Sequence, residues 1–149
     1  MRSIPILVIA TLFFITSVAL AGEQHSGDQP MSRRIVMKVD DQEIFVTLNN
    51  SKASLDFVAM LPATLHFRDY NSTEKVSDLP GILSTSGSPA GFDPSVGDLA
   101  YYAPWGNLAI FYRDFGDSNS LVSLGRLESG IEILAAKQGE FSVLIEAVE

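Results

Sequence analysis

The chain has 149 residues, carries 10 Lys and Arg against 18 Asp and Glu for a formal charge of −8, and contains no cysteine. Its length beyond an apolar N-terminal segment suits one domain with one hydrophobic core. The acidic charge argues against nucleic acid or an anionic membrane as a partner, because both need clustered Lys and Arg. Without cysteine, disulfides, thiolate chemistry and Cys-based metal sites are excluded. With two histidines only, His25 and His66, we expect no metal and no cofactor.

The first residues are typical of a secretory signal peptide. Arg2 gives a short basic start, residues 4–20 are almost wholly apolar, and Ala19-Leu20-Ala21 is a small-x-small cleavage signal. An uncleaved anchor is the alternative, but the apolar run is at the lower limit of length for a membrane span. We therefore predict three segments: a signal peptide over 1–21, a flexible leader over 22–33 and a folded domain over 34–149. The domain is expected to be secreted or periplasmic, and free of the membrane after cleavage.

The domain opens with a predicted β-hairpin and one helix. Apolar residues alternate over 35–39, Asp40-Asp41-Gln42 supplies a turn, and residues 43–48 are rich in β-branched and aromatic side chains. Asn49-Asn50-Ser51 offers helix caps. The helical spacing that follows predicts an amphipathic helix over 52–61, which Pro62 ends.

Short strands and turns are expected in the rest of the chain. A strand is predicted over 65–69, and a polar turn over 71–75 is expected to hold Glu74 and Lys75 as an exposed ion pair. The later segments are a surface loop over 84–96, two strands joined by a Pro/Gly/Asn turn over 97–112, a polar loop over 114–120, a strand over 121–127, a short helix or turn over 131–137 and a final strand over 141–148.

In this order the elements resemble the cyclophilin-like family. IVMKVDDQEIFVTLNNSKASLDFVAML resembles the first hairpin and helix of cyclophilins, GDLAYYAPWGNLAIFY the central hairpin, and LGRLESGIEIL a later strand and turn. Bacterial cyclophilin-like proteins share the landmarks seen here at Leu61-Pro62, Glu74-Lys75 and Phe111-Tyr112. The resemblance implies a mainly β fold, a closed cyclophilin-like barrel with one or two short helices. The family has no settled activity.

Arg68 is the residue that the resemblance marks for catalysis. Prolyl-isomerase cyclophilins use an arginine in a Phe-His-Arg strand as the donor to the prolyl nitrogen, beside a Gln, a Trp and a His. Here the strand reads His66-Phe67-Arg68, and its period of two places His66 and Arg68 on one face, opposite Phe67. The family's Gln is replaced by Ala109 or Ile110, and the shortened loop over 116–120 lacks the Trp and His. The other interpretation is a strand-end arginine paired with Asp69 or another carboxylate.

Aromatic residues complete the predicted ligand groove. Phe111 and Tyr112 resemble the family's central aromatic pair, with one expected at the groove and the other in the core. Tyr102 and Trp105 either line the same groove or form a cluster at the rim of the barrel. We predict a groove formed by Arg68, Tyr102, Trp105, Phe111 and Tyr112 that binds a peptide or small ligand without catalysis. The alternatives are a peptidyl-prolyl isomerase with Arg68 as donor, and a structural or assembly role without a small ligand.

Overall fold

A computed structural model describes residues 33–149 of the chain. The predicted signal peptide and residues 22–32 of the predicted leader lie outside the described residues. The described residues form ten strands and two helices: β1 (Arg33–Val39), β2 (Gln42–Leu48), α1 (Lys52–Ala59), β3 (Ala63–Tyr70), β4 (Glu74–Asp78), β5 (Gly91–Phe92), β6 (Asp98–Tyr102), β7 (Asn107–Phe111), β8 (Ser118–Asn119), β9 (Leu121–Leu127), α2 (Ile131–Ala135) and β10 (Phe141–Val148).

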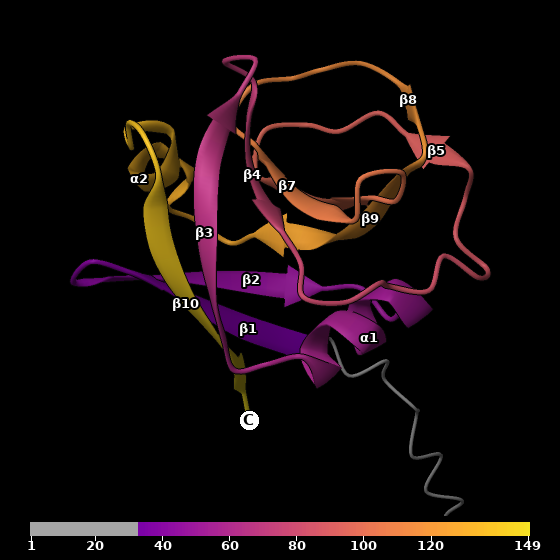
Figure 1. The fold of residues 1–149 in the computed structure, drawn as a ribbon, viewed down its shortest axis with the longest axis horizontal. Coiled ribbons are helices and arrows are strands. Elements are labelled where there is room, and N and C mark those ends of the chain that lie inside the picture. The colour runs from indigo at the N-terminus through magenta and orange to yellow at the C-terminus, as the bar shows by residue number, and fades with distance from the viewer. Residues whose placement is uncertain (1–32) are drawn as a thin grey trace, which may run out of the picture.

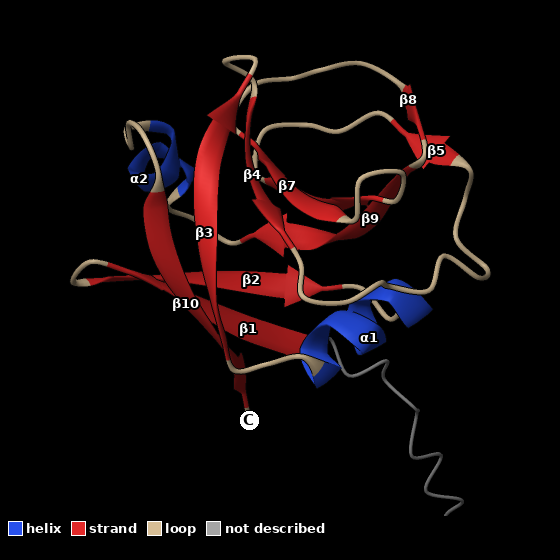
Figure 2. Ribbon diagram, viewed as in Figure 1, coloured by secondary structure: helices blue, strands red, loops and turns tan. Residues whose placement is uncertain are grey.

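Eight strands close into an antiparallel barrel, in the order β1-β10-β3-β4-β7-β6-β9-β2 (Figure 1). The prediction of a mainly β, closed barrel is therefore confirmed. Closure pairs the two edges that an open sheet would leave exposed. The two strands that remain, β5 and β8, pair only with each other in a small sheet outside the barrel (Figure 2).

The main core fills the inside of the barrel. Every second residue of each strand points inward, so that Phe67, Leu108 and Val143 are all fully buried. The helix α1 joins β2 to β3 and α2 joins β9 to β10, which places them at opposite ends of the barrel (Figure 1). Within residues 33–149, neither helix has the length and apolar character needed to span a membrane.

The strand β4 differs from the sequence prediction. The turn ends at Thr73, and Glu74 and Lys75 begin β4 instead of completing a polar turn. Successive residues of a strand point to opposite faces, so these two side chains do not form the predicted ion pair. Glu74 points outward, whereas Lys75 is only 2% exposed at one end of the barrel. Its Nζ lies 3.1 Å from Asp69 Oδ1 and donates to the carbonyl oxygen of Lys137 at 2.8 Å.

A second, smaller apolar cluster lies on the outer face of the barrel. It consists of five buried residues contributed by four neighbouring strands: Val76, Ala100, Ala109, Phe111 and Leu121. Phe92 of β5 and Tyr102 pack against it. The loops before β6 and before β9 are joined here through β5 and β8, so the predicted surface loops contain a short ribbon that covers this face.

Candidate functional site

A cavity of about 220 Å³ opens on the outer face of the barrel. Its walls come from five barrel strands, the turn between β6 and β7, and the loop that contains β8. The lining residues are Tyr70, Glu74, Tyr102, Trp105, Asn107, Phe111, Phe115, Ser118 and Leu121. Five of these nine are aromatic, and one carries a carboxylate.

The sheet register brings these side chains together. Glu74 is the cross-strand partner of both Tyr70 and Phe111, which sets one row of the site. Tyr102 is the partner of both Asn107 and Leu121, which sets a second row. Directly opposed residues of an antiparallel pair project to the same face. The strand pairing alone therefore places all six on the outside of the barrel.

Trp105 forms the most exposed wall of the cavity. It stands on the turn between β6 and β7 and is 60% exposed. Its ring meets Tyr70 and Tyr102 edge to face, at centroid distances of 5.6 Å and 5.3 Å and at interplanar angles of 81° and 89°. The ring of Phe115 packs against the ring of Phe111 at a centroid distance of 6.1 Å. Edge-to-face contacts such as those of Trp105 are a favoured arrangement of aromatic rings.

Glu74 and Asn107 are polar groups of the cavity that lack partners. Glu74 is partly buried, and no Lys, Arg or His of residues 33–149 forms an ion pair with it. Burial raises the pKa of Glu74 to about 7, and the nearby charge of Asp69 adds to the rise. Asn107 is only 3% exposed, and its Oδ1 has no hydrogen-bond partner in the described structure.

The raised pKa of Glu74 predicts a pH-dependent gain in stability for Glu74→Gln. Folding raises this pKa from 4.5 to about 7, so its contribution is fully present below pH 4.5 and is lost as the pH rises through 7. The glutamine side chain of the variant does not ionise. We expect Glu74→Gln to increase the free energy of unfolding by about 1–2 kcal/mol at pH 8, after allowance for solvent screening, and to change it little at pH 4.

Urea unfolding of both proteins at pH 4, 6 and 8 measures this effect. Glu43→Gln is the matched control, because Glu43 is exposed on β2 across the barrel from β4. An equal effect of the two substitutions at pH 8 would contradict the assigned desolvation of Glu74.

Three of the five predicted groove residues line this cavity, namely Tyr102, Trp105 and Phe111. Tyr112 does not. Its hydroxyl donates to Asp69 Oδ1 at 2.6 Å, and its ring lies 5.2 Å from Lys75 Nζ at the end of the barrel. Burial and this hydrogen bond raise the pKa of Tyr112 to about 12. The structure therefore places Tyr112 beside the buried lysine rather than at the aromatic cavity.

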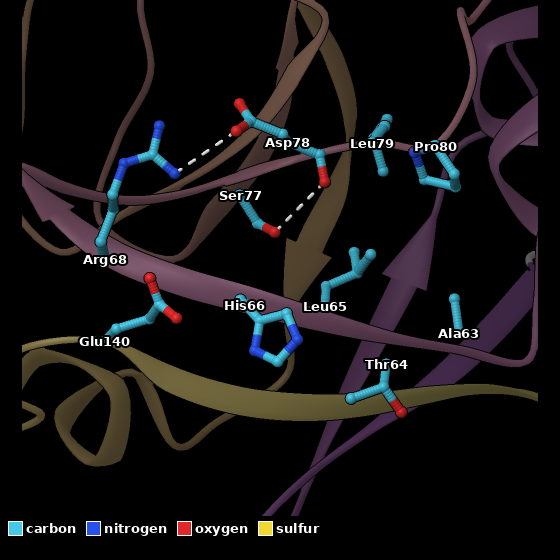
Figure 3. A pocket seen from close by; sticks show the side chains of 10 residues that line it. All are labelled: Ala63, Thr64, Leu65, His66, Arg68, Ser77, Asp78, Leu79, Pro80 and Glu140. Carbon is cyan, nitrogen blue, oxygen red and sulfur yellow. Dashed lines mark hydrogen bonds and ion pairs between the residues drawn. The ribbon is translucent and has the colours of Figure 1, made fainter.

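Arg68 also lies outside the aromatic cavity. It shares the outer face of β3 with His66, opposite the buried Phe67, as the alternation predicts. Arg68 lines a separate hollow of about 500 Å³, where its Nη1 lies 3.6 Å from Asp78 Oδ2 (Figure 3). Both side chains are exposed. This placement matches the interpretation of Arg68 as a strand arginine paired with another carboxylate.

The predicted groove omitted six of the nine lining residues, including the polar Glu74 and Asn107. Asn107 could have been identified from the sequence, because it begins an otherwise apolar strand, NLAIF. The structure shows that every residue of this strand is buried. A buried amide usually requires partners. Glu74 was assigned to a turn, so its outward position beside Phe111 was not predicted. No cluster of three or more His, Asp or Glu within residues 33–149 has the geometry of a metal site.

The comparisons agree with this fold. Residues 37–146 match the model of the cyclophilin-like family, and the chain belongs to that family. The fold is also similar to the solution structure of a hypothetical protein from Archaeoglobus fulgidus. That likeness has a TM-score of 0.62 at 16% sequence identity, covering 80% of this chain and 98% of the archaeal chain. At such low identity it shows the fold alone. No curated protein matches the sequence.

Proposed function

We propose that this domain is a binding module that holds a small ligand, or one side chain of a peptide, in the aromatic cavity without catalysis. The observation that carries this proposal is the joining of five aromatic rings and two unpartnered polar groups in one concavity on the outer face. Ligand sites are concave, mostly apolar and contain a few polar groups that fix orientation. The described cavity has each of these properties.

The size of the cavity supports a small occupant. At about 220 Å³ it is smaller than the roughly 300–1,000 Å³ of pockets that enclose drug-sized ligands. Trp105 lies on a turn and Tyr102 at the end of a strand. Because Trp105 is largely exposed, a group bound against it remains in contact with solvent. A peptide is therefore expected to contribute one side chain to the cavity, with the remainder of the peptide outside it.

A fragment titration followed by NMR tests the proposal. We expect some members of a set of small neutral, cationic and anionic compounds to shift the amide signals of Asn107, Phe111 and Leu121. These residues line the cavity from two strands. Binding that shifts only the signals around Arg68, or no binding at all, would contradict the proposed location.

Trp105→Ala is expected to weaken the binding of any such fragment by about tenfold or more, because aromatic anchors dominate recognition sites. Its effect on stability is expected to be small, since the side chain is largely exposed. Affinities measured by calorimetry check the first expectation. Ile82→Ala is the control, because Ile82 is an exposed apolar residue that does not line the cavity.

The proposal of binding without catalysis has its own test. In a protease-coupled assay, the domain is expected to leave the cis–trans rate of an X-Pro peptide unchanged, because Arg68 is paired with Asp78 and lies outside the aromatic cavity. A clear acceleration that Arg68→Ala abolishes would replace the binding module with a prolyl isomerase.

The proposed site of action is the periplasm or the cell exterior. The support is the signal-peptide pattern of residues 1–21. Mass spectrometry of the protein recovered from the producing cells is expected to find Gly22 at its N-terminus. An intact N-terminus in the membrane fraction would instead favour the uncleaved anchor.

A further inference from the structure

The cavity contains two hydrogen-bond acceptors without donors, beside hydroxyl, amide and indole groups that can themselves donate. Asn107 Oδ1 is buried without a donor, although buried polar atoms normally have one. The Glu74 carboxyl is the only charged group among the lining residues. One acceptor comes from β7 and the other from β4, and both lie on the outer face of the sheet. Because Asn107 Oδ1 has almost no exposed surface, a ligand would meet Glu74, whose carboxylate accepts hydrogen bonds.

The walls of the cavity favour positive charge. The faces of aromatic rings carry negative electrostatic potential, and a cation within about 6 Å of a ring centroid is attracted to it. Trp105 stands nearly perpendicular to Tyr70 and Tyr102, so the site contains rings in more than one orientation. No Lys or Arg lines the cavity, and the formal charge of the whole chain is −8.

Anionic and quaternary ligands fit these features less well. A carboxylate or phosphate would be repelled by Glu74. A quaternary ammonium would be attracted to the rings but has no N–H group to donate to Glu74. A primary ammonium has three N–H donors and a full positive charge.

We propose that the ligand of this cavity presents a primary alkylammonium group, which donates to the Glu74 carboxylate while its methylene chain packs against Trp105. This inference rests on the proposed binding function and specifies the chemistry of its ligand. A lysine side chain of a peptide and a free alkylamine both supply this group. The small cavity volume is compatible with either one.

Isothermal titration with four probes tests the proposal on the full domain. The probes are n-pentylammonium, Nα-acetyl-lysine methylamide, tetramethylammonium, and the neutral alcohol n-hexanol, which is one methylene group longer than n-pentylammonium. We expect one or both primary ammonium probes to bind at least tenfold more tightly than n-hexanol and tetramethylammonium. The fluorescence of Trp105, the single tryptophan of the chain, is expected to change in the same titration and so report the location.

Substitution of the carboxylate provides the matched comparison. Glu74→Gln keeps the shape of the side chain and is expected to remove most of the preference for ammonium over n-hexanol, with n-hexanol affinity retained. Glu43→Gln makes the same chemical change at an exposed position of β2 outside the site and is expected to leave the preference unchanged.

The possible outcomes separate the two proposals. Binding of the pentylammonium but not of the lysine derivative identifies a free amine as the source, and comparable binding of both admits a peptide lysine. Equal or tighter binding of n-hexanol or tetramethylammonium would overturn the inference of a primary ammonium and leave the binding module in place. If no probe binds or changes Trp105 fluorescence, and the neutral, cationic and anionic fragments also leave the cavity signals unchanged, both proposals fail.

Discussion

Gly125→Ala is expected to lower the free energy of unfolding by about 3 kcal/mol or more, because β9 and β2 lie too close together at this position to leave room for a methyl group. A Cβ atom at this position would lie 2.2 Å from the carbonyl oxygen of Thr47 and 2.8 Å from Leu48 Cα. Both are backbone atoms, so a rotamer change cannot relieve the contact. Only three residue pairs join β2 to β9, and the clash falls at one of them.

Urea unfolding followed by circular dichroism measures this loss. Gly139→Ala is the matched control, because nothing lies within 4 Å of its added Cβ although its φ is +67°. That substitution is expected to cost about 1 kcal/mol through its left-handed backbone alone. If Gly125→Ala costs no more than Gly139→Ala, the close approach of β2 and β9 is not as described.

Lys75→Ala is expected to lower the free energy of unfolding by about 3 kcal/mol, far more than a surface lysine would. The Nζ atom donates to Asp69 and to the carbonyl oxygen of Lys137, and it lies over the ring of Tyr112. Truncation removes these contacts and leaves a hole at the end of the barrel. Asp69 retains its bonds to Tyr112 and to the backbone of Ser72.

Lys75→Met separates packing from hydrogen bonding, because methionine fills most of the same volume. We expect it to lose less stability than Lys75→Ala, measured by the same urea titration. Lys38→Ala is the control for an exposed ion pair, since Lys38 and its partner Glu146 are both solvent-facing. A similar loss for Lys38→Ala and Lys75→Ala would show that burial of Lys75 adds nothing.

The barrel was largely predictable from local patterns. The alternation over 35–39, the Asp40-Asp41-Gln42 turn and the caps before α1 each indicate one element, and their order resembles one family. The strand β4 was not predictable in this way, because Glu74-Lys75-Val76-Ser77-Asp78 carries the polar composition of a turn. Three of its five residues are nevertheless buried, including Lys75 and Ser77. Tertiary contacts outweigh local propensity here.

The aromatic half of the site was predictable, and the polar half was not. Tyr102, Trp105 and Phe111 stood out because aromatic side chains near turns often line binding surfaces. Arg68 stood out only through the resemblance, and its partner depends on where Asp78 falls across the sheet. The position of Glu74 beside Tyr70 and Phe111 depends on the register of three strands, which short-range sequence patterns do not specify.

The ribbon of β5 and β8 has a consequence for how this domain can change. Its pairings, Gly91 with Asn119 and Phe92 with Ser118, join two connecting segments to each other and leave the barrel strands to pair among themselves. Insertions or substitutions in these segments can therefore alter the entrance and roof of the site while the eight-stranded frame keeps its own hydrogen bonds. If the cavity binds a ligand as proposed, changes in these segments would alter what it recognises while the pairing of the barrel strands is kept.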